Sequence, residues 1–292
     1  LALGNLLRRR GKGDGSIAVY QKLLVNSQLN RTELNLIKLG LVKSYVAAGL
    51  LDRAEKLSDE LKVADTDIQI AVLNQGLTVY QLEKEWEKGI MVITDLLKLC
   101  PLNQREVLQI KASHFYCELA EKELEFQHYN QAKDYLNKAV SMEKSNVRTS
   151  LVKGRIEFEQ KNYKQAIKAL LKISSQNASY KAEAFDLIIA SYQAMDKQLK
   201  LNKYIESSLQ ERLSSSLLLL IIKYIKNTEG EEKAKEILSQ KISTNPSIEL
   251  LGQAIMLNEK SKNDFIAIKF NEILEEYLEN KSKYQCENCG FD

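Results

Sequence analysis

Two cysteines near the end of the chain have the spacing of a metal-binding knuckle. Cys286 and Cys289 are separated by two residues and followed by Gly290, and in C-x-x-C-G segments two thiolates bind one metal ion from a tight turn. The glycine permits the positive φ that turns backbone amides toward sulfur. A structural zinc needs four ligands, so this pair is half of a zinc-ribbon or rubredoxin-type site. Either the second half follows Asp292 or the site is vestigial, and we expect this chain alone to bind metal weakly or not at all.

Other interpretations of the cysteine pair stay open on the residues alone. A redox-active dithiol favours a strand before the pair and a helix after it, and the sequence around Cys286 has neither pattern. A chance C-x-x-C on a disordered tail is the other alternative, because short motifs recur without function. Tyr284 and Phe291 flank the pair and favour the knuckle, so Cys286 and Cys289 are predicted metal ligands.

His114 and Cys117 lie one helical turn apart and could form a nucleophile and its base. Their neighbours Ala112, Phe115 and Leu119 are apolar, which favours Cys117 as a small packed hydrophobe. A catalytic pair also needs an orienting group and an oxyanion donor. The sequence offers no glycine-rich phosphate loop after a strand and no Ser/His/Asp set. We therefore expect a protein that is not an enzyme.

The elements that would position these residues are predicted to be helices. The 292 residues include two prolines and twelve glycines, and such scarcity of breakers favours an all-α fold. Hydrophobic residues make up 44% and charged residues 28%, enough to bury a long core. A net charge of +3 is close to balance and argues against a nucleic-acid surface. Four cysteines without a disulfide framework indicate a reducing compartment.

The ends of the chain suggest a piece of a longer protein. No run of about eighteen apolar residues is present, so no transmembrane helix is expected within it. The sequence begins at Leu1 without a methionine, inside a repeat, and stops three residues after Cys289. We expect a soluble fragment cut at both ends.

Pairs of residues twelve positions apart reveal internal repeats; both members are small in three pairs, and one member is larger in the other three. The second members of these pairs follow one another at 38, 35, 43, 34 and 68 residues. A period near 34 built from paired helices is typical of tetratricopeptide repeats, and the small residues mark points where two helices cross closely. The pairs are Gly4/Ser16, Val42/Ala54, Leu77/Gly89, Ala120/Ala132, Gly154/Ala166 and Ile222/Ala234.

The late repeats are less regular. Residues 184–209 form a helical pair without the small-residue signature, 217–243 recovers it, and 248–279 is a closing pair or cap. A glycine-rich turn is expected at Gly11–Gly15 in the first, partial unit. We predict a tetratricopeptide superhelical solenoid over residues 1–280 and a partial rubredoxin-like or zinc-ribbon segment over 281–292.

A stack of such hairpins winds into a superhelix whose first helices line a concave wall. Helical phase nominates polar residues on that wall as contacts for protein partners, although a minority of contact residues carries binding energy. The nominated residues are Lys43, Asn74, Thr78, His114, Glu121, Arg148 and Arg155.

Four segments resemble the lipopolysaccharide assembly protein B family, the tetratricopeptide and rubredoxin-like regulators of Gram-negative bacteria. The resemblance covers essentially the whole chain and is firmest over residues 1–173. It is carried by Leu3–Leu6, Tyr45–Leu50 with Asp52–Glu55, His114–Ala120 and Tyr284–Phe291.

The resemblance implies a function that composition does not give. It implies a non-enzymatic adaptor that brings a deacetylase to a membrane AAA metalloprotease, which degrades it. The deacetylase is the enzyme that commits carbon to lipid A synthesis. A lipopolysaccharide-sensing membrane protein opposes this action of the adaptor. The resemblance also implies an N-terminal anchor, absent here, that places the repeats on the cytoplasmic face of the inner membrane. Cys286 and Cys289 match the first of two cysteine pairs on one zinc or iron ion. The alternatives are a general envelope-assembly scaffold or chaperone and, less favoured by charge, a nucleic-acid-binding ribbon protein.

Overall fold

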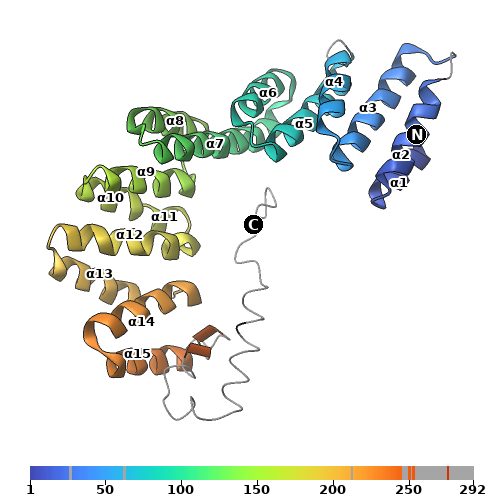
Figure 1. The fold of residues 1–292 in the computed structure, drawn as a ribbon. Coiled ribbons are helices and arrows are strands. Elements are labelled where there is room, and N and C mark those ends of the chain that lie inside the picture. The colour runs from blue at the N-terminus through green and yellow to red at the C-terminus, as the bar shows by residue number, and fades with distance from the viewer. Residues whose placement is uncertain are drawn as a thin grey trace. The chain divides into compact units, whose positions relative to one another are not determined.

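The computed structural model of the chain describes residues 1–25, 28–61, 64–211, 213–244, 249–250, 252–253 and 275. These residues form helices joined by turns, with no β-strand among them. Figure 1 shows the helices following one another as hairpins. The predicted all-α tetratricopeptide-type array is therefore confirmed for this part of the chain. Cys286, Cys289, the segment 281–292 and most of the closing pair expected at 248–279 lie outside the described residues.

The helices come in pairs with short connections. Their bounds are α1 Ala2–Arg9, α2 Gly13–Leu24, α3 Arg31–Ala47, α4 Leu51–Glu60, α5 Thr66–Leu82, α6 Trp86–Leu99, α7 Leu102–Glu125, α8 Tyr129–Met142, α9 Val147–Glu159, α10 Tyr163–Leu170, α11 Ile173–Gln176, the 3₁₀ helix η1 Ala178–Tyr180, α12 Lys181–Ala194, α13 Gln198–Gln210, α14 Ser215–Glu229 and α15 Glu231–Thr244.

The chain divides into two compact units, Leu1–Ile156 and Glu157–Asp292, with the boundary inside α9. In the first unit α3 packs against α2, α4 and α5, and α7 packs against α6 and α8. In the second unit α12 packs against α10, α13 and α14, and α14 packs against α15. Contact limited to sequence neighbours is the pattern of a repeat stack, in which each hairpin is stabilised by the next.

One turn geometry closes six of the hairpins. At each turn one residue has φ between 52° and 73°, and the next amide donates to the carbonyl five residues back, as Leu50 N does to Tyr45 O at 2.9 Å. This is the Schellman closure of a helix C-terminus. Figure 1 shows these turns at the ends of the pairs. The positive-φ residues are Gly11, Gly49, Lys84, Gln127, Lys161 and Asp196.

Two details differ from the regular repeat expected from the sequence, one in a turn and one in the length of a helix. The glycine-rich turn expected at Gly11–Gly15 is shorter, because Lys12 N already closes on Leu7 O at 2.9 Å and α2 begins at Gly13. The interval of 43 residues between Gly89 and Ala132 reflects the length of α7, which has 24 residues against 17 in α3 and α5.

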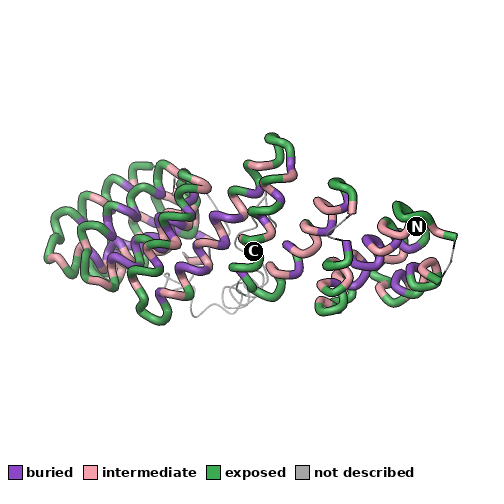
Figure 2. The backbone as a smooth tube through the Cα atoms, turned by 90° about the horizontal axis from the view of Figure 1, so that it is seen from above, coloured by how far each residue is buried: buried purple, intermediate pink, exposed green. Residues whose placement is uncertain are grey.

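Every member of the six pairs twelve residues apart is buried. Ser16, Ala54, Ala120, Ala132, Ala166 and Ala234 are fully buried at 0% exposure. Figure 2 shows buried residues recurring at intervals along the helices. The predicted role of these positions in packing is confirmed.

The closest approaches surround Tyr20 on α2. A Cβ added to Gly4 would lie 2.6 Å from the Tyr20 ring, and one added to Gly40 would lie 2.4 Å from it. The ring is fully buried between α1 and α3. Beside it, Ser16 Oγ donates to Gly4 O at 2.8 Å and lies 2.8 Å from Ser44 Oγ. Glycine on the outer helices and a hydroxyl on α2 therefore hold three helices together.

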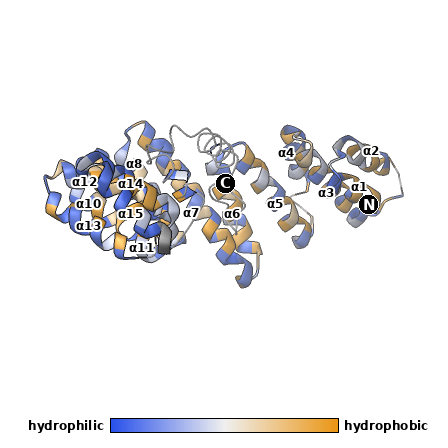
Figure 3. Ribbon diagram, turned by 90° about the horizontal axis from the view of Figure 1, so that it is seen from below, coloured by the Kyte–Doolittle hydropathy of each residue, from blue (hydrophilic) through white to orange (hydrophobic). Residues whose placement is uncertain are grey.

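A second aromatic contact joins α6 to α7. A Cβ at Gly89 would lie 2.6 Å from the Phe115 ring, and Trp86 lies 5.1 Å from the same ring, centroid to centroid. α6 is rich in apolar residues, coloured orange in Figure 3. Trp86 thus serves packing between the helices of neighbouring repeats. Among the residues described, no helix combines the length and the apolar character needed to cross a bilayer.

We predict that Gly40→Ala lowers the free energy of unfolding by about 1–3 kcal/mol, because the new methyl group overpacks the Tyr20 ring. Urea-unfolding midpoints measure the change. Gly76 in α5 is the matched control, since a Cβ there meets nothing within 4 Å. Gly76→Ala should stabilise the chain by up to about 1 kcal/mol through helix propensity. Equal effects of the two substitutions would contradict the close approach at Gly40.

Candidate partner-binding surface

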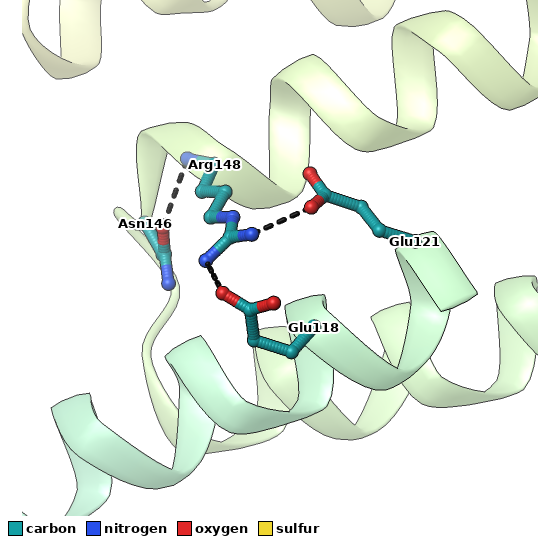
Figure 4. Close-up of polar contacts among 4 residues, drawn as sticks. All are labelled: Glu118, Glu121, Asn146 and Arg148. Atoms are coloured by element: carbon teal, nitrogen blue, oxygen red, sulfur yellow. Dashed lines mark hydrogen bonds and ion pairs between the residues drawn. The ribbon is translucent and has the colours of Figure 1, made fainter. Parts of the chain in front are cut away.

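An ion-pair cluster joins α9 to α7 inside the first unit. Arg148 Nη1 donates to Glu118 Oε1 at 2.6 Å, and Arg148 Nη2 donates to Glu121 Oε2 at 2.5 Å. Figure 4 shows the guanidinium between the two carboxylates. The three side chains are each between 26% and 30% exposed. One cation thus neutralises one of two half-buried anions.

Local sequence positions each member of the cluster. Glu118 and Glu121 are three residues apart on α7 and therefore share one face. Asn146 stands before α9, where its Oδ1 accepts from Arg148 N at 2.9 Å and its Nδ2 donates to Ser113 Oγ at 2.8 Å. Asn146 and Ser113 are buried. A buried polar link from the start of α9 to α7 thus fixes where Arg148 projects.

Charge and burial set the protonation of the cluster. Burial of Arg148 disfavours its charge, but hydrogen bonds from Arg148 to Glu121 and Glu118 outweigh burial and raise its pKa. Burial lowers the pKa of His114, the Arg148 charge lowers it further, and Glu118 and Glu143 oppose the shift in part. The imidazole is therefore held in its neutral form beside the ion pairs.

Cys117 does not form a nucleophile with His114. Its side chain is fully buried, and burial, opposed by Arg148, raises the pKa of the thiol to about 12. A thiol of this pKa stays protonated at neutral pH and is a poor nucleophile. Cys117 packs with Ala120, Leu124 and Ala132, which confirms its predicted role as a small hydrophobe.

Helix packing brings three of the seven nominated contact residues together. His114 and Glu121 on α7 and Arg148 on α9 come together in the cluster just described. Lys43 is half-buried on α3, Asn74 and Thr78 are exposed on α5, and Arg155 is exposed on α9.

Local hydrogen bonds occupy the two polar residues of α5. Asn74 Nδ2 donates to Ile70 O at 2.8 Å, and Thr78 Oγ1 donates to Asn74 O at 3.0 Å. Their exposed atoms remain accessible to a partner. Bonds of this kind are common within helices and are therefore not in themselves evidence of a binding role. Whether any of the seven contacts a partner stays a prediction.

Choosing contact residues by their position around each helix missed two members of the ion-pair cluster, Glu118 and Asn146. Glu118 lies one turn before Glu121 on the same helix, so the spacing that selected one carboxylate could have selected the other. Asn146 has the residue type and position of a helix N-cap. Within the described residues no three His, Cys, Asp or Glu side chains gather as a metal site, and the metal prediction at Cys286 and Cys289 lies outside them.

The comparisons with known proteins support the resemblance noted from the sequence. No family model matches the chain. Lipopolysaccharide assembly protein B of Escherichia coli (strain K12) is 29% identical over 297 residues, which cover 100% of this chain and 75% of that protein. The protein of the same name from Haemophilus influenzae is 26% identical over 295 residues, covering 100% and 73%. The predicted similarity is confirmed.

Solved structures with a similar outline are tetratricopeptide-repeat proteins. One from Parabacteroides merdae has 15% identity and a TM-score of 0.44, covering 94% of this chain and 96% of that one. The tetratricopeptide domain of P58(IPK) has 14% identity and a TM-score of 0.33, covering 97% and 98%. These scores are low, and the hairpin architecture rests on the turns and packing of this chain.

We predict that Arg148→Met destabilises the chain by about 1–3 kcal/mol, because two half-buried carboxylates lose their common cation. Urea unfolding measures the loss. Arg155→Met on the same helix is the control and should change stability by less than about 0.5 kcal/mol. Adding Glu118→Gln and Glu121→Gln to Arg148→Met should restore part of the stability. A triple variant no more stable than Arg148→Met would contradict the electrostatic origin of the loss.

A pH dependence follows from the lowered pKa of His114. The unfolded imidazole, with a pKa near 6.5, takes up its proton before the folded one as the pH falls. The contribution of His114 to folding is therefore present above about pH 6.5 and is lost on further acidification. Unfolding curves at several pH values should show a steeper loss for the wild type than for His114→Gln. Parallel pH profiles would count against the buried neutral imidazole.

Proposed function

We propose that this chain is a non-enzymatic scaffold in lipopolysaccharide assembly. The similarity to lipopolysaccharide assembly protein B over the whole chain carries the proposal. The hairpin array is consistent with it, because stacked repeats present extended surfaces to other proteins. In the one histidine–cysteine pair that resembled a nucleophile and its base, the Cys117 thiol is fully buried and its raised pKa keeps it protonated, which removes the leading catalytic candidate.

At finer detail we propose an adaptor that regulates synthesis. The chain would hold the deacetylase that commits carbon to lipid A close to a membrane AAA metalloprotease, which degrades it, while a lipopolysaccharide-sensing membrane protein opposes this action. Holding enzyme and protease together replaces a bimolecular search by a high effective concentration. Tethering needs no catalytic residue, so an array of helical pairs is sufficient for it.

The place of action in this proposal is the cytoplasmic face of the inner membrane, reached through an anchor outside this chain. Cys286 and Cys289 would supply two ligands to a zinc or iron ion, with the other two outside this chain. Both statements rest on the resemblance to the family. The half-buried cluster of Glu118, Glu121 and Arg148 is the candidate protein contact that combines charge with fixed geometry.

The alternative is a general scaffold or chaperone of envelope assembly without a role in proteolysis. The word "assembly" in the name of the relatives favours it. The two functions differ in their partners. Affinity capture on the repeats should recover the deacetylase and the protease for an adaptor, and envelope transport components for a general scaffold.

In cells we predict that deleting the repeats while keeping the anchor lengthens the half-life of the deacetylase. The loss of tethering removes the high local concentration on which degradation depends. Pulse–chase immunoblotting measures the half-life, and restoring the repeats on a plasmid should shorten it again. Unchanged degradation after the deletion would rule out the adaptor role and leave the general scaffold.

A further inference from the structure

A segment of the second unit carries lysines without carboxylates. From Gln160 to Ala182 the sequence contains five lysines and no aspartate or glutamate, although the whole chain is nearly balanced at +3. Helix α10 lies inside this segment. Such a local excess of one sign produces a positive surface potential that net charge does not reveal.

Four of these lysines form what we name the lysine stripe: Lys161, Lys164, Lys168 and Lys172. Lys164, Lys168 and Lys172 follow at intervals of four, and Leu171 and Lys172 keep helical dihedral angles after the end of α10. The spacing places them on one face. Lys161 stands in the turn before α10.

The lysine stripe faces solvent and has no ion-pair partner among the described residues. All four side chains are exposed, whereas Ala166 and Leu170 on the opposite face are buried. None of the four forms an ion pair with any residue that the structure describes. Some lysines on other second helices pair with nearby acids, as Lys98 does with Asp95 of the same helix at 2.8 Å and Lys233 of α15 does with Glu229 at the end of α14.

The next second helix, α13, extends the positive surface. Lys197, Lys200 and Lys203 are exposed and form no ion pair with the described part of the chain. Both α10 and α13 pack against α12, and Figure 3 shows these three helices near one another. In a stack of hairpins the second helices line one face, so the two sets of lysines add to one field.

Exposed leucines stand among these lysines. Leu199 is 81% exposed between Lys197 and Lys200, and Leu171 is 39% exposed beside Lys172. A side chain as exposed as that of Leu199 buries little apolar surface against its own chain. Basic residues interspersed with exposed apolar ones are typical of surfaces that lie against the headgroup layer of a membrane.

We propose that the outer faces of α10 and α13 bind the anionic headgroups of a lipid surface. The lysine stripe with Lys197, Lys200 and Lys203 supplies the attraction, and Leu199 and Leu171 enter the headgroup layer. This inference does not depend on the proposed role in lipopolysaccharide assembly. It assigns a membrane contact to the repeats themselves, formed by side chains of the array.

A lipid surface fits these residues better than an acidic protein or a nucleic acid. A bilayer presents mobile anions over a wide area and can meet two helices at once, and it rewards exposed leucines that a phosphate backbone would leave in water. Specific nucleic-acid binding relies in addition on aromatic or polar side chains aimed at bases. The exposed positions between these lysines hold Asn162, Gln165, Gln198 and Asn202 besides Leu171 and Leu199, and no fully exposed aromatic side chain on which a base could stack.

The test is co-sedimentation of the 292-residue chain with vesicles of phosphatidylcholine containing about a third phosphatidylglycerol. We expect binding that weakens as salt is added and is absent on pure phosphatidylcholine. Replacing the lysine stripe by glutamine (K161Q, K164Q, K168Q, K172Q) should weaken binding by about tenfold or more, given the contribution of each lysine near an anionic surface. Leu199→Ser should weaken it by a few-fold.

A matched variant controls for net charge. K56Q, K98Q, K122Q and K138Q remove four exposed lysines from other helices and should leave vesicle binding nearly unchanged. Equal losses in both quadruple variants, or no binding by the wild type at low salt, would overturn the proposal. Tighter binding of polyglutamate or duplex DNA than of vesicles through the same lysines would assign the surface to another partner and overturn it as well. Circular dichroism confirms that each variant is folded.

Discussion

Close approach between helix backbones governs the structure of this chain. Where glycine, alanine or serine faces a neighbouring helix, the helices come near enough for one aromatic ring to fill the space, as Tyr20 does between Gly4 and Gly40. Interiors are packed as densely as organic crystals, so a single added methyl group at such a point has nowhere to go. The spacing of the pairs then fixes which faces are buried and which side chains are left at the surface.

Polar residues are placed by this packing, and they act in two ways. On α7 and α9, buried Asn146 and half-buried Arg148 join neighbouring hairpins through hydrogen bonds and ion pairs. On α10, lysines project from the side opposite the packed face and form no ion pair with any acid that the structure describes. In the first arrangement Arg148 is paired with two carboxylates inside the chain. The second leaves charge available for something outside it, so the two surfaces call for different kinds of partner.

Much of the fold could be predicted from the sequence because its signal is periodic. The pairs twelve residues apart identified buried positions such as Val42 and Ala54, and the breaker count identified the helices. Gly40 was not identified, since its partner Tyr20 lies 20 residues away and outside the twelve-residue rule. The positive φ of Lys84, Gln127 and Lys161 could not be predicted from the sequence either, because these residue types do not favour that conformation. Hydrogen bonding in the turn imposes it.

The candidate site was harder to predict, for a physical reason. Arg148 and Glu121 are 27 residues apart in the chain, and no local pattern specifies which acid an arginine will meet across two hairpins. The phase of a helix gives the side on which a residue lies but not the reach of its side chain. His114, Glu121 and Arg148 were therefore nominated singly, while Glu118 and the buried Asn146 became apparent once the helices were packed.

The shared geometry of the turns has a consequence for how such chains change length. Six connections have the same closure although their central residues differ in type, so the joint between two helices does not depend on a particular side chain. A whole hairpin inserted or removed by duplication or loss of a gene segment would find the same joints on both sides. Arrays of this kind can thus grow or shorten by complete units over evolution without any new loop having to arise.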